Sequence, residues 1–432
     1  MNDIDGLIHE LHRHLAVEQI ITDAETLHAT SIDGLEPRLI VLPETIEQVS
    51  QVVALTNQHN LTLLVRGGGI RMSLGVMPER FDILLDTRRL SRLLDHQPER
   101  HTCRVEAGML LSTLQEQLAK KGQRLPLDPV DARQTTIGGL LATNAFGPLT
   151  LRYGTPRDLA TSVQIVQSDG TLAESIDAIG ALGTSGVIVE ATLKLDDVPA
   201  IARTLFLTYA HVTDAMDTVF SLLNSPLVPS AMELIDAGAA SDLSNFFGIN
   251  MPTNGYTLAL LIEGLQATVE QHISDIQGVA RTHNALLTDD LEDGQQHTFW
   301  NALRNHTQGT VTCTITLPPE QLVAFLRDLE STCSRYTLDS AFTAHAGNGV
   351  LSVELRPGDA TSRIIEAITA LRLHADAVQG RLVVEQCPID LRRRMPMQTV
   401  QDAWPELVAI QQQAQRVDPK GTFARGKALR LS

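Results

Sequence analysis

Hydrophobic positions in the first part of the chain recur with helical and strand spacing in turn. Apolar residues at helical spacing within residues 1–30 predict one or two short amphipathic helices. The run 38–43 is apolar and ends at a proline, which is typical of a short buried strand. Residues 45–48, Thr-Ile-Glu-Gln, have the form of a capping box that starts a helix, and 61–65 is a second apolar strand. Strand, helix and strand in this order predict a compact α/β unit.

The same alternation continues to about residue 198. Apolar runs predict strands over 81–86 and 103–107, and Ser-Thr-Leu-Gln at 112–115 is a second possible capping box. Residues 163–172 alternate around an Asp-Gly pair, which is a strong signal for a β-hairpin. The β-branched run 187–195 predicts a further strand.

From about residue 200 the pattern changes to longer strands and helices. Predicted strands cover 204–209, 231–235, 256–263, 310–317, 341–355 and 381–385, and predicted helices cover 213–223, 269–279, 319–329 and 362–378. Two βαβ-like units with antiparallel closure predict a second domain of the α+β class.

Composition limits the partners and the compartment. The chain has 432 residues and a formal net charge of −17, which argues against nucleic acid or an anionic membrane as a main partner. The four cysteines, Cys103, Cys313, Cys333 and Cys387, lie far apart, so the sequence predicts no zinc, iron–sulfur or disulfide framework. We expect a reducing, cytoplasmic setting, because the N-terminus is charged and amphipathic and no apolar run is long enough to span a bilayer.

Three clusters of small residues interrupt the first domain. The first is Gly67, Gly68 and Gly69, directly after the strand at 61–65. Such a loop lets the backbone approach a ligand closely and converge its N–H groups on a phosphate, although it fits a flexible turn equally well. The second cluster, at 135–147, fits either close helix packing or a ligand, and its Thr and Asn residues favour the ligand. The third is a small-residue loop at 180–186 that leads into the strand at 187–195.

A nicotinamide dinucleotide on a Rossmann fold is the rival interpretation of the first cluster. That fold needs G-x-G-x-x-G at the start of a helix, with an acidic residue further on. Residues 67–72 lack the final glycine, and no clear helix follows them. The sequence therefore excludes this alternative.

The ordered motifs resemble a known family. RGGG at 66–69, LPLDP at 125–129, TTIGGLLATNAFGP at 135–148, RYGTPRDL at 152–159 and GALGTSGVIVEATLKL at 180–195 resemble the FAD-binding domain of the vanillyl-alcohol oxidase / p-cresol methylhydroxylase (PCMH) type. The resemblance implies an α+β fold with a two-subdomain FAD-binding domain followed by an α+β cap, or substrate, domain. It implies an N-terminal helical segment (1–34), the FAD-binding domain (35–198), the cap (199–415) and a C-terminal segment returning to the FAD domain (416–432).

The resemblance also assigns cofactor-binding residues. It implies that backbone amides of Gly67, Gly68, Gly69, Ile70 and Arg71 hold the FAD pyrophosphate. The other residues that it assigns to the cofactor are Arg66, Met72, Pro129, Thr136, Gly138, Gly139, Thr143, Asn144, Gly147, Gly183, Gly186, Val187 and Ile188. Some members attach FAD covalently through a histidine near the glycine loop, where this chain has Ile70 and Arg71, so we expect non-covalent FAD.

In the second half, FWNALR at 299–304, AHAGNGV at 344–350, the stretch 370–380 and LVVEQCP at 382–388 extend the resemblance. With them, the chain over its whole length most resembles the smaller FAD-binding (E-type) subunit of bacterial glycolate oxidase. Related D-2-hydroxyacid dehydrogenases carry two histidines around a glycine-rich segment and a later Glu-His-Gly, which supply metal ligands and a base. Here Ser352 replaces the second histidine and Gln386 the basic one, so we expect no metal site. The catalytic candidates that remain are His345, Glu385 and Arg304, and each has a purely structural alternative.

The resemblance implies an FAD-dependent oxidoreductase that oxidises a small 2-hydroxy acid. It further implies a second flavoprotein subunit and an iron–sulfur subunit as partners, in the cytoplasm and peripheral to the inner membrane through them. Because Gln386 cannot act as a general base, two alternatives stay open. One is a self-sufficient flavin oxidase of another alcohol that uses other residues, and the other is a non-catalytic assembly subunit that retains FAD for structure.

Overall fold

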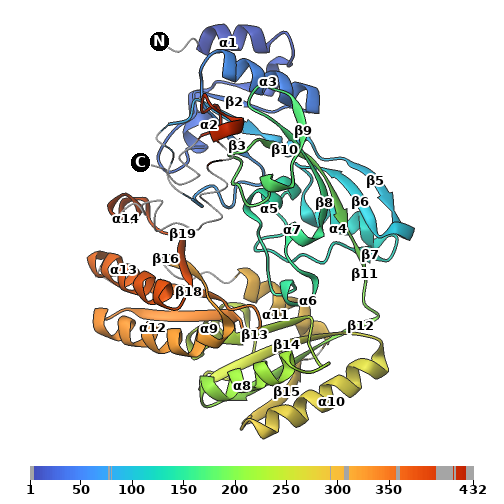
Figure 1. Cartoon of the computed structure of the whole chain (residues 1–432), viewed down its shortest axis with the longest axis vertical. Coiled ribbons are helices and arrows are strands. Elements are labelled where there is room, and N and C mark those ends of the chain that lie inside the picture. Colours follow the sequence, from blue (N-terminus) through green and yellow to red (C-terminus); the bar gives the residue numbers. More distant parts are fainter. Residues whose placement is uncertain are drawn as a thin grey trace. The chain divides into compact units, whose positions relative to one another are not determined.

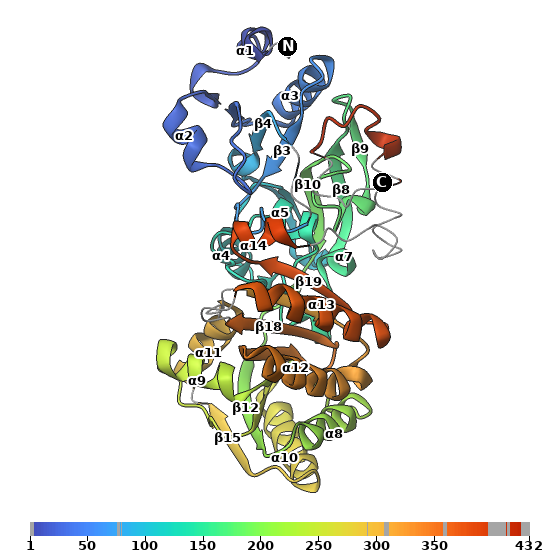
Figure 2. The same ribbon diagram turned by 90° about the vertical axis from the view of Figure 1, so that its left-hand side faces the viewer.

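The chain forms two compact units. The computed structural model describes residues 4–75, 78, 80–291, 293–305, 311–356, 361–395, 412 and 415–424, drawn in two orientations in Figures 1 and 2. The first unit comprises Met1–Phe146, Thr155–Val198 and Pro396–Ser432, and the second comprises Gly147–Gly154 and Pro199–Met395. The short segment 147–154 thus belongs to the second unit, although the sequence on both sides of it belongs to the first.

The first unit contains a four-stranded sheet in the order β1-β2-β4-β3. These strands are Ile20–Ile21, Leu39–Val41, Ile83–Asp86 and Leu63–Arg66, and the nearby helices are α1 (Ile4–Leu11), α2 (Ala24–Ala29) and α3 (Ile46–Gln58). β2, β4 and β3 are parallel, whereas β1 is antiparallel to β2. Side chains from α1, α3 and the strands share one core, in which Leu7, Val49 and Leu63 are fully buried. β2, α3 and β3 form the predicted strand–helix–strand unit.

A second, antiparallel sheet completes the first unit, in the order β5-β6-β10-β8-β9. Its strands are Leu93–Gln97, Thr102–Glu106, Val187–Lys194, Ala160–Val166 and Leu172–Glu174. The associated elements are α4 (Leu111–Ala119), α5 (Ile137–Thr143), α7 (Pro156–Leu159) and the small pair β7 (Gln123–Arg124) and β11 (Asp196–Asp197). Leu114, Leu118 and Leu140 of the helices pack with the sheet in one core. The β8–β9 hairpin turns at the predicted Asp-Gly pair.

The two predicted capping boxes have different outcomes. Thr45 caps α3, because its Oγ1 accepts a hydrogen bond from the backbone N–H of Gln48, but the Gln48 side chain accepts from Glu44 rather than from Thr45. The box predicted at 112–115 is wrong, since α4 begins two residues earlier than that box requires, with Leu110 rather than Ser112 as its N-cap. The Gln115 side chain instead makes two hydrogen bonds with the backbone ten residues further on. Burial of Leu111 and Leu114 therefore sets the start of this helix.

The end of the described chain lies against β3. Phe423 pairs in parallel with Leu63, and hydrogen bonds run from Leu63 N to Thr422 O (2.6 Å) and from Ala424 N to Leu63 O (2.9 Å). Both carboxylate oxygens of Asp418 accept backbone N–H groups of this turn. The strand that precedes the glycine loop is thus paired on both edges. Residues 425–432 of the predicted C-terminal segment lie outside the described residues.

The second unit is built on an eight-stranded antiparallel sheet in the order β15-β12-β14-β13-β17-β18-β16-β19. Its strands are β12 (Ile201–Tyr209), β13 (Ala231–Ile235), β14 (Tyr256–Gly264), β15 (Leu287–Leu291), β16 (Val311–Thr316), β17 (Asp339–His345), β18 (Val350–Arg356) and β19 (Arg381–Gln386). All the strands that were predicted in this half form. β15 was missed, because its sequence LTDDL carries two charged residues and alternates poorly.

Helices cover both faces of this sheet (Figures 1 and 2). The helices are α6 (Thr150–Tyr153), α8 (Val212–Leu223), α9 (Ala237–Phe247), α10 (Gln266–Thr282), α11 (Asp293–Asn305), α12 (Leu322–Tyr336), α13 (Thr361–Ala377) and α14 (Ile389–Arg394). One core joins α8, α10, α12 and α13 to one face, and a separate core joins α9 and α11 to the other. Within the described residues, no helix combines the length and apolar character needed to cross a lipid bilayer.

Asp236 caps α9 and is unusually weakly acidic. Its carboxylate accepts hydrogen bonds from the backbone N–H groups of Ala239 (2.8 Å) and Phe342 (3.1 Å). Burial raises the pKa of Asp236 to about 6, because the cost of desolvating the charge outweighs these two bonds. The folded chain therefore binds this proton more tightly than the unfolded chain. The resulting stabilisation is complete at low pH and is lost as the pH rises through the folded pKa.

We expect Asp236→Asn, which keeps an acceptor but cannot titrate, to abolish this pH dependence. Between about pH 4.5 and about pH 7.5 the unmodified chain should lose about 2 kcal/mol more unfolding free energy than the variant. Urea unfolding of the full chain at a series of pH values measures this. The matched control is Asp23→Asn, because Asp23 caps α2 through Thr26 and its pKa is lowered by that bond. Identical pH slopes for the unmodified chain and Asp236→Asn would contradict the assignment.

Candidate functional site

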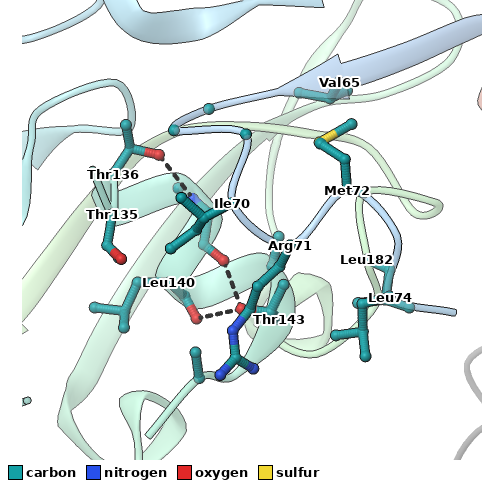
Figure 3. Close-up of a pocket in the computed structure, with 18 of the residues that line it drawn as sticks. Val65, Ile70, Arg71, Met72, Leu74, Thr135, Thr136, Leu140, Thr143 and Leu182 are labelled. Carbon is teal, nitrogen blue, oxygen red and sulfur yellow. Dashed lines mark hydrogen bonds between the residues drawn. The ribbon is translucent and has the colours of Figure 1, made fainter. Parts of the chain in front are cut away.

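A pocket in the first unit is formed by three backbone segments that the sequence marked as glycine-rich. It encloses about 900 Å³, including the part open to solvent. The loop after β3, the start and one face of α5, and the segment 182–188 contribute its walls (Figure 3). The assigned cofactor residues that line it are Gly67, Gly68, Gly69, Ile70, Arg71, Met72, Pro129, Thr136, Gly138, Gly139, Thr143, Gly183, Gly186 and Ile188.

The glycine loop lies directly against the segment that leads into α5. A Cβ atom on Gly68 would lie 1.7 Å from the carbonyl oxygen of Gln134, and one on Gly67 would lie 2.2 Å from Thr136 Oγ1. Neither position has room for a side chain. Within the described part of the chain, the backbone N–H groups of Gly68, Gly69 and Ile70 have no protein acceptor. This is a cradle of free N–H donors, which suits a phosphate.

The first amides of α5 are used within the protein. Gly138 N donates to Ala107 O (2.7 Å), and Gly139 N donates to Oγ1 of the N-cap Thr136 (3.2 Å). A Cβ on Gly138 would lie 2.8 Å from the Cβ of Ala107, so this glycine lets α5 approach the second sheet. Thr143 Oγ1 donates to Gly139 O on the same helix face. The glycine loop, rather than the α5 N-terminus, therefore supplies the free donors.

The segment 182–188, which forms the third wall of the pocket, is held by hydrogen bonds near the C-terminal end of α5. Leu182 N donates to Ala142 O, and Gly180 N donates to Leu141 O. Leu182 lines the pocket with φ of +53°, a strained conformation for a branched residue. Gly183 has φ of +75°, which a glycine adopts without strain.

Four of the assigned cofactor residues do not line the pocket. Arg66 forms an ion pair with Asp86, and Val187 points into the core because strand side chains alternate and Ile188 faces the pocket. Asn144 ends α5 in the left-handed conformation, and its Oδ1 accepts from Arg157 N. Gly147 belongs to the second unit.

The cofactor residues assigned by the resemblance leave out part of the wall, although Thr135 belongs to the cluster whose Thr and Asn residues favour a ligand. The additional lining residues are Leu64, Val65, Leu74, Thr87, Val130, Thr135, Leu140, Ala142, Ala145 and Leu182. Most are apolar and look like core residues in the sequence. Helical spacing could have found Leu140, which lies on the face of α5 that carries Thr136 and Thr143.

The catalytic candidates lie in the second unit. His345 ends β17 and faces Glu233 of β13 across the strand pair, with Nδ1 and Oε1 2.5 Å apart. The Glu233 side chain is only 1% exposed, whereas that of His345 is 24% exposed. A buried carboxylate thus orients a partly accessible imidazole.

Glu385 lies on the same sheet face as His345. Thr343 lies two residues before His345 on β17, so its side chain is on the same face. Thr343 pairs with Ser352 of β18, and Ser352 pairs with Thr314 of β16, so Thr314 is on this face as well. Thr314 Oγ1 donates to Glu385 Oε1 (2.9 Å). Arg304 is half-buried in the last turn of α11, a helix that packs on this face. Among the described residues, no group of three or more His, Cys, Asp and Glu side chains could hold a metal ion.

Comparisons with known proteins agree with this arrangement. Residues 37–175 match the family described as FAD binding domain, and residues 198–368 match that described as FAD linked oxidases, C-terminal domain. Glycolate oxidase subunit GlcD of Bacillus subtilis (strain 168) is 22% identical over 376 residues, which cover 81% of this chain and 80% of that protein. D-2-hydroxyglutarate dehydrogenase of Stutzerimonas stutzeri (strain A1501) is 24% identical over 392 residues, 83% of this chain and 84% of that protein.

The solved structures identify the fold. The structure of p-cresol methylhydroxylase with substrate bound superposes with a TM-score of 0.77 at 14% identity, covering 98% of this chain and 96% of that one. The chain therefore has the two-domain fold of the PCMH/vanillyl-alcohol oxidase type, and the predicted fold class is confirmed. It carries the FAD binding domain and the C-terminal domain of the FAD-linked oxidases, is an FAD-linked oxidoreductase, and has FAD as its cofactor. The glycolate oxidase relative is subunit GlcD, so the likeness to the E-type subunit stays a prediction.

We expect Gly68→Ala to weaken FAD binding at least about tenfold, since the added methyl would overlap the Gln134 carbonyl and move the loop. Titration of FAD into the apoprotein, followed by calorimetry, measures the change. Gly278→Ala in α10 is the control, because a Cβ there meets nothing within 4 Å. It should stabilise the helix slightly and leave FAD affinity unchanged. Unchanged FAD affinity in Gly68→Ala would refute the cradle.

Proposed function

We propose that this chain oxidises a small 2-hydroxy acid as the FAD-binding subunit of a glycolate oxidase-like complex. The observation that carries the proposal is the likeness, over about four fifths of the chain, to a glycolate oxidase subunit and a D-2-hydroxyglutarate dehydrogenase, together with a pocket that offers N–H donors to a phosphate. A second flavoprotein subunit and an iron–sulfur subunit are the proposed partners. In this proposal the complex is cytoplasmic and meets the inner membrane through those partners.

The pocket suits FAD that is held without a covalent bond. The N–H groups of Gly68, Gly69 and Ile70 would hold the pyrophosphate, and Thr136, Gly139 and Thr143 would lie along the rest of the cofactor. Among the described residues that line the pocket there is no His, Cys or Tyr, the side chains that would offer a nucleophile for covalent attachment. When bound, FAD supplies a hydride acceptor, and the protein supplies position and proton transfer.

His345 is the proposed proton acceptor. Oxidation of a 2-hydroxy acid to a 2-oxo acid removes one proton from the hydroxyl group and one hydride from C2. Gln386, where the related dehydrogenases have a basic histidine, cannot take that proton. The Glu233 carboxylate accepts the Nδ1–H of His345, which leaves the Nε2 lone pair as the basic position of the neutral ring. Glu385 and Arg304 are proposed to assist at the same face of the sheet.

The His345–Glu233 pair also favours a second candidate, a chain that is catalytic by itself. An oriented base of this kind removes the main reason to assign the chemistry to a partner subunit. Bleaching of bound flavin by glycolate or D-lactate in the isolated chain would support the second candidate. Bleaching only after addition of partner subunits would support the first. No bleaching in either case would contradict both and leave a structural role for FAD.

We expect His345→Asn, which keeps an N–H near the position of Nδ1, to slow flavin reduction by about 100-fold or more. FAD affinity should not change, because the cradle is formed within the first unit. Stopped-flow absorbance with the chain alone or with its partners measures the rate. The control is His374→Asn, since His374 forms an exposed pair with Asp328. Equal rates for His345→Asn and the unmodified chain would exclude His345 as the base.

A further inference from the structure

A cluster of charged side chains surrounds a buried carboxylate at the end of β4, next to the residue from which the glycine loop departs. The Asp86 side chain, at the end of β4, is fully buried. Its carboxylate accepts hydrogen bonds from Arg66 Nε (3.0 Å) and Nη2 (2.7 Å), and from the backbone N–H and the guanidinium group of Arg88. Two guanidinium groups share one carboxylate, so the cluster carries an excess of positive charge.

Arg66 connects this cluster to the cofactor cradle. It is the last residue of β3 and directly precedes Gly67, and its side-chain Cδ would lie 3.6 Å from a Cβ on Gly69. The Arg66 stem therefore runs beneath the loop. Its carbonyl oxygen accepts from Thr87 Oγ1 (3.2 Å). β4 thus fixes both the side chain and the backbone of the residue from which the loop departs.

Asp86 is an anion at neutral pH despite its burial. Burial alone would raise the pKa of Asp86, but the hydrogen bonds from Arg88 and Arg66 together hold the pKa below its ordinary value. Charged partners make these hydrogen bonds stronger than those to a neutral amide. An asparagine at this position would have a similar shape without the charge.

We propose that Asp86 is a positioning residue for the cofactor's pyrophosphate. It acts through Arg66, which it draws under the loop, and so holds Gly68, Gly69 and Ile70 with their N–H groups free of protein acceptors. The surplus positive charge of the cluster favours an anion at the same place. This inference concerns only cofactor binding and is independent of the substrate.

Asp86→Asn in the full-length apoprotein should raise the Kd for FAD at least about tenfold, the range expected for lost bonds to a charged group. ADP, which carries a pyrophosphate, should show a comparable loss. The matched control is Asp82→Asn at the other end of the same strand. Asp82 is also buried and accepts two hydrogen bonds from Thr62 at 2.9 Å. It should lower the melting temperature and leave both Kd values unchanged.

A double-mutant cycle separates positioning from simple support of β4. In an Arg66→Gln background, Asp86→Asn should add less than about a twofold further loss, because the route through Arg66 is already broken. Full additivity of the two changes would overturn the proposal. So would an unchanged or tighter Kd in Asp86→Asn, or an equal loss in Asp82→Asn, because each would show that the Asp86 charge does not act on the loop.

Discussion

The pocket depends on one constraint, which is that no side chain fits between the glycine loop and the segment before α5. Gly67 and Gly68 touch Thr136 and the Gln134 carbonyl so closely that no Cβ fits. The same kind of approach recurs where Gly138 meets Ala107 and brings α5 onto the second sheet. The pocket is therefore bounded by backbone at the points where a phosphate needs N–H donors. β3 must be held firmly for this to persist, and it is paired on one edge by β4 and on the other by the segment around Phe423.

The features that could be predicted from the sequence are those where lack of space requires a glycine. Glycine clusters mark the loop and the α5 start, because other residues would clash there. The apolar wall leaves no such mark, since Leu140 and Leu182 have the same character as core residues. Asn144 and Val187 belong to the right segments, but helix termination and strand alternation turn them away from the pocket. Strand β15 was missed for the reverse reason, because an edge strand carries polar residues that weaken its pattern.

In the second unit, the sequence shows which histidines are replaced, whereas only the structure shows that His345 has a carboxylate partner. The resemblance implies that Ser352 and Gln386 stand where related dehydrogenases have metal-ligating and basic histidines, and both residues are visible in the sequence. The partner of His345 cannot be recognised in the sequence, because Glu233 lies 112 residues earlier and is brought next to His345 only by the pairing of β13 with β17. A carboxylate with 1% exposure needs a charged or donating partner, and His345 provides it. The partial exposure of the imidazole is what a purely structural pair would not require.

A net charge of −17 disfavours the binding of a pyrophosphate by the chain as a whole, and the local geometry of the glycine loop offsets this effect. Charges on a surface are screened over about 10 Å at ordinary ionic strength, whereas a cluster buried beside the cofactor is screened far less. Asp86 is fully buried and Arg66 is largely buried, whereas Arg88 is half exposed, and the three groups together carry a positive surplus. Among the described residues, the N–H groups of Gly68, Gly69 and Ile70 have no protein acceptor and add oriented dipoles. In our proposal, affinity for the cofactor depends on these few fixed groups of the first unit rather than on the net charge of the chain.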